Sequence, residues 1–179
     1  VDGGVTENFR FIPGAETIVE QVDGLQADLL IIVDANEVER AGVCGISAAS
    51  LNTPIIVVDH HPTKTFFAHA SIIHSGYVSA TEAVLEWLTF LGWEVSHDTA
   101  YALLVGLITD TQAFRVGNVT GATFLKAQQL MDKGVDLRGI IERTLTRTVT
   151  GQIPLIGRAF VNSKLENHVI WTFLHLNDF

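Results

Sequence analysis

The chain has 179 residues, a formal net charge of −9 at pH 7 and 47% hydrophobic residues, enough to bury one sizeable core. The negative charge argues against a large sequence-independent contact with duplex nucleic acid, which needs a basic surface. No apolar run is long enough to span a bilayer, and the first residues do not have the pattern of a secretory signal. The single cysteine, Cys44, excludes an internal disulfide and favours the cytoplasm.

The first part of the chain predicts a parallel sheet. Residues 15–22 fit a short helix, and the apolar runs 28–33 and 55–58 fit strands separated by a helical stretch over 43–51. A strand, a helix and a strand in this order form a right-handed crossover with parallel strands. Continuous apolar strands are typical of a sheet covered on both faces. We therefore expect an α/β fold, a mostly parallel sheet with helices on both faces.

The second part of the chain predicts helices followed by a short hairpin. Ser79 and Glu82 fit a capping box that begins a helix, and Gly92 fits its end. Residues 98–108 are apolar nearly all round, which predicts a central buried helix. The remaining predicted elements are three helices and the two strands of an antiparallel hairpin, over residues 120–133, 136–145, 151–161, 161–165 and 168–176. The turn of this hairpin is expected at Glu166 and Asn167.

Polar residues that could bind a metal or act as acids and bases follow both predicted strands. The segment Asp59-His60-His61-Pro62 ends the second strand, and Asp34 ends the first. Because parallel strands present their carboxyl ends at one edge of the sheet, these side chains should converge there. Asp110 follows the central helix and adds a third carboxylate. On its own, the triplet after the second strand also fits three polar residues that cap a buried strand.

The types of side chain in this cluster are those of a metal site. Three carboxylates and two imidazoles suit Mn, Fe, Zn or Co, whereas carboxylates alone would suit Mg or Ca. Two such ions, about 3.5–4 Å apart and bridged by a carboxylate, are a common means of activating water against a phosphate ester. The alternative is that Asp34 and Asp110 only cap helices. The predicted convergence at one sheet edge favours the metal site.

Three successive motifs resemble those of the DHH phosphoesterase superfamily. They are Asp34, the segment 59–62, and Gly106–Thr111 with Phe114. The segment Ser79–Glu82 is similar to one that the family places between them. The resemblance is to the RecJ-like branch, which contains bacterial oligoribonucleases (nanoRNases) and cyclic-dinucleotide phosphodiesterases. It covers roughly residues 9–165.

The resemblance implies a role for each matching residue. Asp34 would bridge two Mn ions, and His60 and Asp110 would bind one of them. Asp59 would orient the His60 ring, since metal-bound histidines are usually held by such a partner. His61 would face the scissile phosphate or the leaving oxygen, so His61 and Asp59 are the candidate catalytic residues.

Three further residues are candidates for substrate binding. Arg40 matches an arginine of the family, but it fits an ion pair at a helix start equally well. Arg115 and Asn118 follow the Asp110 motif. They fit either the lining of a substrate cleft or a solvated loop.

The sequence departs from the family pattern at its start. In the family, a histidine followed by two aspartates after the first strand supplies most ligands of the other ion, but here no histidine precedes His60. A Gly-rich, His-containing motif of the C-terminal substrate domain is also missing. Truncation, which Val1 favours, and a degenerate paralogue both fit this pattern. We expect residues 1–162 to form a DHH domain without its first motif, and residues 163–179 to begin a linker or the C-terminal domain.

The expected function is metal-dependent phosphodiester hydrolysis in the cytoplasm, as part of a longer enzyme that uses two Mn ions. The segment alone is expected to hold one ion or none and to hydrolyse its substrates poorly or not at all. The expected partners are short single-stranded oligonucleotides or cyclic or linear dinucleotides, with no membrane partner and with a homodimer as a further option. RNA, DNA and cyclic substrates all fit the sequence. The alternatives are a non-catalytic nucleotide-binding or regulatory module and a pyrophosphatase-like phosphohydrolase.

Overall fold

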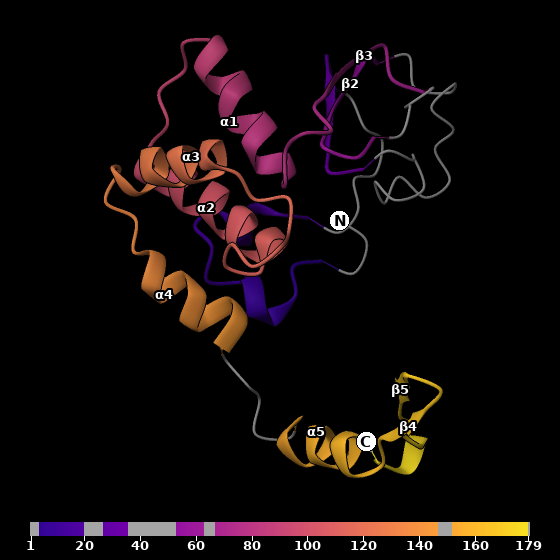
Figure 1. Cartoon of the computed structure of the whole chain (residues 1–179). Helices are drawn as coiled ribbons and strands as arrows, with labels where there is room; N and C mark the ends of the chain where they lie inside the picture. The colour runs from indigo at the N-terminus through magenta and orange to yellow at the C-terminus, as the bar shows by residue number, and fades with distance from the viewer. Residues whose placement is uncertain (1–3, 20–26, 36–52, 63–66, 147–151, 179) are drawn as a thin grey trace. The chain divides into compact units, whose positions relative to one another are not determined.

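The computed structural model describes residues 4–19, 27–35, 53–62, 67–146 and 152–178. The chain divides into two compact units, Val1–Leu145 and Thr146–Phe179, whose elements are drawn in Figure 1. The predicted end of the DHH domain at residue 162 stays a prediction. Within the described residues, no helix combines the length and the apolar character needed to cross a membrane.

The first unit contains the predicted parallel sheet. Its strands are β1 (Leu30–Val33), β2 (Ile55–Asp59) and β3 (Ala70–Ile73). The order is β1-β2-β3, and both strand pairs are parallel, which confirms the predicted α/β class. The central strand β2 is the most deeply buried, whereas Ile31 and Val33 of β1 are about half exposed, at 45% and 53%. The uniformly buried character expected for both strands therefore holds for β2 and not for β1, which lies at one edge of the three-stranded sheet.

Helices form the main core of the same unit. They are α1 (Ala80–Phe90), α2 (His97–Thr111), α3 (Gly121–Met131) and α4 (Leu137–Ile141). The central helix α2 packs against all three others, and α1 also contacts β2 (Figure 1). Leu104, Leu107 and Ile108 of α2 are almost completely buried. The helix predicted from its all-round apolar pattern is thus the centre of the core, and it continues three residues beyond the predicted end.

The ends of α1 depend on the residues that the sequence singled out. Ser79 is the N-cap, and its hydroxyl accepts a hydrogen bond from the Thr81 amide at 3.2 Å. Gly92 has a φ of +68°, the left-handed conformation that ends many helices. The carboxylate of Glu82 accepts from the Val78 amide at 2.7 Å. In the predicted capping box it would have accepted from the Ser79 amide, so the box is displaced by one residue.

Two predicted helices differ in the structure. In its described part, residues 15–19, the helix expected over 15–22 is a single 3₁₀ turn at Ala15–Thr17, where no side chain caps the first residue and the chain is extended again at Ile18. The helix expected over 136–145 is α-helical only over Leu137–Ile141 and widens into a π-helical turn at Glu142–Thr146. The helix expected over 43–51 lies outside the described residues.

The second unit is a helix with a hairpin. The helix α5 (Gln152–Val161) precedes the antiparallel strands β4 (Lys164–Glu166) and β5 (Val169–Trp171). Asn167 and His168, with φ values of 50° and 65°, form the turn, one residue later than predicted. The hydroxyl of Thr172 donates to the Ala159 carbonyl at 2.8 Å and so ties the hairpin to α5.

Candidate metal centre

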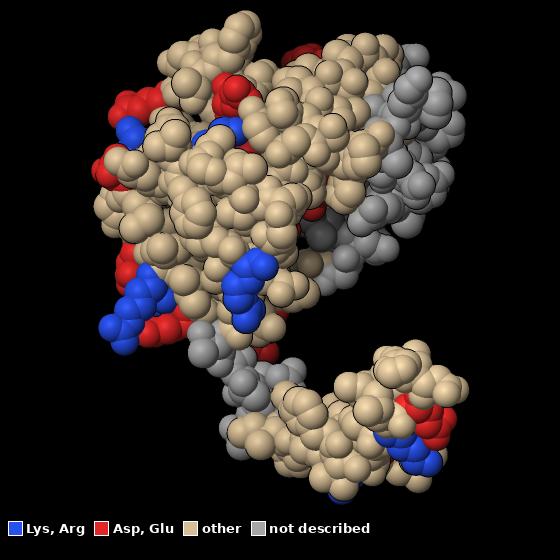
Figure 2. Space-filling view, in the orientation of Figure 1, with Lys and Arg blue, Asp and Glu red and all other residues tan. Residues whose placement is uncertain are grey.

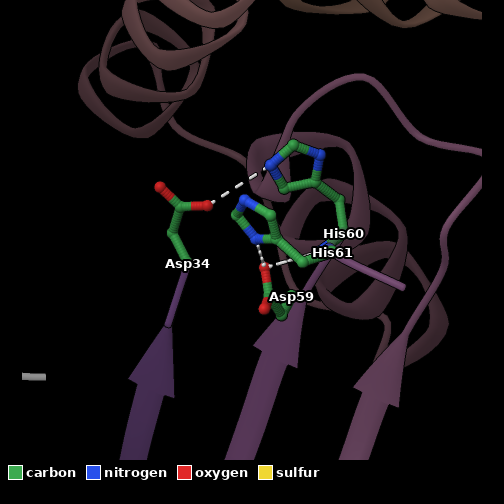
Figure 3. A group of neighbouring side chains, drawn as sticks. All are labelled: Asp34, Asp59, His60 and His61. Carbon is green, nitrogen blue, oxygen red and sulfur yellow. Dashed lines mark hydrogen bonds and ion pairs between the residues drawn. The ribbon is translucent and has the colours of Figure 1, made fainter. Parts of the chain in front are cut away.

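The polar ends of β1 and β2 form one cluster. Asp34 directly follows β1, Asp59 is the last residue of β2, and His60 and His61 come next (Figure 3). Each of the four offers a ligand atom, and these atoms all lie within 4.8 Å of one another. The structure therefore brings Asp34 and Asp59 to the same edge of the sheet, as parallel strands require.

The backbone turns sharply at Asp34. Its φ of 55° is left-handed, a conformation that aspartate tolerates better than most residues. Its amide still donates to the Val58 carbonyl at 3.0 Å, which continues the pairing of β1 with β2 by one residue. The Asp34 carboxylate consequently leaves the strand beside the polar residues that follow β2 (Figure 3).

Asp59 is a fully buried carboxylate with an unequal environment. Its Oδ1 atom accepts from the backbone amides of His60 at 2.7 Å and His61 at 3.3 Å, and it lies 2.8 Å from the His61 ring Nδ1. Its Oδ2 atom is buried without a hydrogen-bond partner among the described residues. A buried carboxylate oxygen without a partner is unfavourable. In Figure 3 the Oδ1 atom faces the histidine rings and Oδ2 lies on the other side of the carboxylate.

The His60 ring is held by a different group from the one predicted. Its Nδ1 atom lies 3.3 Å from the backbone carbonyl oxygen of Tyr77, and its Nε2 atom lies 3.4 Å from Oδ1 of Asp34. Asp59, the predicted partner of this ring, contacts His60 only through the backbone amide and instead pairs with the ring of His61. Side chains alternate along an extended chain, which favours contact between residues 59 and 61.

The positions of the ring protons follow from these partners. A carbonyl oxygen can only accept, so a neutral His60 carries its proton on Nδ1 and leaves a lone pair on Nε2. That lone pair faces the Asp34 carboxylate at 3.4 Å. A cation placed between Nε2 and this carboxylate would be attracted by both. The pair is therefore suited to bind one cation together.

The electrostatics of Asp34 support the same conclusion. Burial raises the pKa of Asp34, and the nearby carboxylates of Asp110 and Asp59 raise it further, while His60 and His61 oppose this effect. Asp110 thus acts on the site electrostatically, although its carboxylate is not in the group with ligand atoms within 4.8 Å. A divalent cation would relieve the repulsion among these acids.

A feature not anticipated from sequence follows Asp110. Gln112, Ala113 and Phe114 are three successive left-handed residues, with φ values of 49°, 56° and 63°. The buried hydroxyl of Thr111 accepts from the Phe114 amide at 3.0 Å and donates to the Leu107 carbonyl at 2.6 Å. Such backbone strain is often found at functional sites. In the sequence, the only hint of this turn was Thr111, the threonine that follows Asp110 in the motif.

The structure describes two of the three candidate substrate-binding residues, Arg115 and Asn118. Arg40 lies outside the described residues. Arg115 is exposed, and its Nε donates to the Gln112 carbonyl at 2.8 Å. Asn118 is also exposed. The substrate-binding roles of all three stay predictions.

Several curated proteins are similar in sequence to this chain, although no protein-family model matches it. The protein "Bifunctional oligoribonuclease and PAP phosphatase NrnA" of Thermus thermophilus is 29% identical over 135 residues, which are 75% of this chain and 40% of that protein. The chain is homologous to the NrnA proteins. The NrnA of Mycoplasma pneumoniae is 25% identical over 172 residues, 94% of this chain and 53% of that protein. The resemblance to nanoRNases of the DHH superfamily is thereby confirmed, and the chain spans about half the length of these NrnA proteins or less.

Solved structures show the same fold. An exopolyphosphatase-related protein from Bacteroides fragilis superposes with a TM-score of 0.81 at 22% identity, covering 90% of this chain and 50% of that one. A putative family II inorganic pyrophosphatase from Methanococcus jannaschii gives a TM-score of 0.59 at 17% identity, covering 91% of this chain and 58% of that one. At these identities the likeness concerns the fold alone.

Proposed function

We propose that this chain carries a metal centre of a phosphohydrolase that cleaves phosphodiesters in short oligonucleotides or dinucleotides. The observation that carries the proposal is the convergence of four donors, two carboxylates and two imidazoles, within 4.8 Å at the carboxyl edge of a parallel sheet. The NrnA relatives are named as oligoribonucleases and phosphatases, which is the same class of reaction.

The chain's own residues divide the work in this proposal. Asp34, His60 and Asp59 would hold a divalent ion, for which we propose Mn, and Asp110 would add negative charge nearby. When bound, such an ion supplies charge stabilisation to a phosphate and activates water. His61, whose ring is oriented by Asp59, would face the phosphate or its leaving oxygen.

The surface favours a small substrate over a long duplex. The formal charge is −9, and on the face drawn in Figure 2 the described Lys and Arg side chains form separate small groups. A long duplex is bound through many phosphate contacts, each of which needs a basic group. A short single-stranded oligonucleotide or a cyclic or linear dinucleotide needs far fewer. We propose these as the substrates, with the cytoplasm as the location and a homodimer as a further option.

The proposal is tested by hydrolysis of diadenylate and of a short single-stranded RNA at high protein concentration. We expect slow turnover that requires added Mn²⁺ and disappears in Asp34→Asn, a variant that keeps the size of the side chain but loses its charge. Failure of the wild-type chain to bind Mn²⁺, or turnover unaffected by Asp34→Asn, would contradict the proposal. Inorganic pyrophosphate serves as the comparison substrate, and faster cleavage of it than of diadenylate would favour the pyrophosphatase alternative.

A further inference from the structure

The contact between His60 and Tyr77 links the metal centre to a network that the proposed chemistry does not use. The carbonyl of Tyr77 lies 3.3 Å from His60 Nδ1, although the two residues are 17 positions apart. A backbone carbonyl is an effective partner for a ligand histidine because it accepts from one ring nitrogen and frees the other. Its effect depends on how firmly the carbonyl is held in place.

The side chain of Tyr77 is held from several sides. Its ring stacks on His74 with a centroid distance of 3.8 Å and an interplanar angle of 9°. The ammonium group of Lys126, on α3, lies 3.4 Å from the ring centroid. The phenol donates to the Glu86 carboxylate of α1. Burial and the hydrogen bond to Glu86 raise the pKa of Tyr77 to about 12, so the phenol remains a donor at neutral pH.

The backbone on both sides of the Tyr77 carbonyl is fixed as well. The Tyr77 amide donates to the His74 carbonyl at 3.0 Å, which closes a turn directly after β3. The next amide, that of Val78, donates to the buried Glu82 carboxylate at 2.7 Å. The displaced capping box of α1 therefore fixes the orientation of the peptide plane that carries the Tyr77 carbonyl.

We infer that Tyr77 is a positioning residue for the metal centre, which sets the tautomer and orientation of His60 through its backbone carbonyl. The stack with His74, the cation of Lys126 and the hydrogen bond to Glu86 hold Tyr77 in the turn that follows β3. The ring nitrogen Nε2 of His60 is thereby presented to Asp34. This inference rests on the proposed function only for its consequence, which is metal affinity. The tautomer itself is a property of the chain without metal.

The test is the ¹⁵N NMR spectrum of the metal-free chain labelled at histidine, at a pH at which the His60 ring is neutral. The chain has seven histidines, and the signal of His60 is assigned by its loss in His60→Gln. We expect the Nδ1–H tautomer in the wild type. In Tyr77→Ala we expect a mixture with the Nε2–H tautomer, which an unconstrained imidazole favours. We also expect Mn²⁺ affinity to fall about 10–100-fold, as when the partner of a ligand histidine is removed.

The sequence offers a matched control in its other tyrosine. Tyr101, on α2, packs its ring edge-on against Phe11 at a centroid distance of 6.2 Å. Tyr101→Ala removes the same atoms and should leave the His60 tautomer unchanged. Tyr77→Phe keeps the stack and the contact with Lys126, and it should restore most of the Nδ1–H tautomer. If Tyr77→Ala does not fold, Lys126→Met gives the second test and should also produce a mixture.

Each outcome decides one point. The Nε2–H tautomer in the wild type, or an unchanged tautomer in both Tyr77→Ala and Lys126→Met, would overturn the positioning role. An equal shift in Tyr101→Ala would do so too, because it would show a general loosening of the fold. A wild type with the Nδ1–H tautomer that does not bind Mn²⁺ would contradict the proposed function and leave the positioning role intact.

Discussion

At the residue scale, the two adjacent histidines share one tautomer but reach it by different partners. A neutral His60 donates its Nδ1–H to the Tyr77 carbonyl, and a neutral His61 donates its Nδ1–H to the buried Asp59 carboxylate. Both rings thus leave Nε2 free. Both rings lie in the donor cluster with Asp34, and Nε2 of His60 is at ion-pair distance from it, 3.4 Å from Oδ1. The ion pair of His60 with Asp34, and the pairing of the His61 ring with Asp59, are the reasons for proposing His60 for the ion and His61 for the substrate.

That division of roles predicts different effects for two alanine variants. Asp34→Ala should lower Mn²⁺ affinity by more than about 100-fold, because it removes a ligand, and substitutions that only disturb a ligand's orientation already cost about 10–100-fold. His61→Ala should keep Mn²⁺ affinity within a few-fold, since Asp34, His60 and Asp59 remain, while turnover falls. Calorimetric titration of Mn²⁺ into both variants measures the difference. Equal loss of affinity in the two variants would show that His61 is a ligand.

The strand residues of the site were predictable, whereas the partner of His60 was not. Asp34 and Asp59 follow apolar runs, and parallel pairing alone brings them to one edge. The partner of His60 is a main-chain atom, and any residue of the right turn could provide it. Sequence patterns carry no information on such a contact. The choice between Asp59 and Tyr77 depended on the direction of one ring.

At the element scale, the crossing of α1 and α2 depends on a glycine. A Cβ atom added to Gly106 would lie 2.4 Å from Cγ2 of Thr81, a distance that no stable contact allows. The two helices are therefore in close contact where Gly106 of the Asp110 motif meets Thr81 of the α1 cap. This contact ties the end of the helix that carries Asp110 to the element that holds Tyr77.

Gly106→Ala should destabilise the fold through this crossing. Overpacking a core contact typically costs about 1–3 kcal/mol, and the better helix propensity of alanine offsets about 0.5–1 kcal/mol of it. Thr81→Ser removes the clashing methyl group and keeps the hydroxyl that lies 2.8 Å from the Ser79 hydroxyl. The double variant should thus recover most of the loss. Urea denaturation of the four proteins of this cycle measures it, and additive effects would refute the predicted clash.

The network between α1 and α3 predicts a pH dependence of stability. Burial lowers the pKa of Lys126 from its ordinary value of 10.5, and the charges of Glu82 and Glu86 oppose this only in part. Between the lowered value and 10.5, the unfolded chain binds more protons than the folded one, so the free energy of unfolding rises with pH in this window. Below the window, the charged amine in a buried position reduces stability.

Lys126→Met removes the charged amine, and with it the pH-dependent loss of stability, and keeps most of the apolar stem of the side chain. The variant should gain stability relative to the wild type near neutral pH, and the gain should shrink as pH rises toward 10. Measurements should stop there, because Tyr77, with its pKa raised from 10.0 to about 12, contributes stability that is lost as pH rises through this higher range. Thermal denaturation at several pH values is the measurement. A difference between the two proteins that does not change with pH would contradict the prediction.

The element boundaries show which local patterns are reliable. Ser79 and Gly92 were recognised as the limits of α1 because a side-chain cap and a left-handed glycine act locally. The helix expected at residues 15–22 failed in its described part for the same reason, since Gly14 offers no capping side chain and the chain leaves the helix at Ile18. The displacement of the Glu82 contact to Val78 depends on the path of the chain before the helix. Local patterns do not determine that path.

At the scale of the whole molecule, the described donors suffice for one metal ion. The residues of the tight cluster are Asp34, Asp59, His60 and His61, and the described part of the chain contains no other group of three or more His, Cys, Asp or Glu residues able to hold an ion. A second ion would share Asp34, as the family resemblance implies. It would then need ligands beyond the described cluster.

We therefore expect one Mn²⁺ ion per chain, bound weakly, and hydrolysis far below that of a two-ion enzyme. With one ion, the charge stabilisation at either the attacking or the leaving oxygen is lost, and loss of one stabilising group alone can cost about 100–1,000-fold in rate. Affinity should also fall at acidic pH, since His60 must be neutral to bind a metal.

Titration of Mn²⁺ followed by water proton relaxation gives the stoichiometry. Diadenylate hydrolysis by the chain, compared with the NrnA of Thermus thermophilus under identical conditions, gives the rate. Two ions per chain together with turnover equal to that of NrnA would show that the tight cluster is only part of a complete site and that the one-ion prediction is wrong.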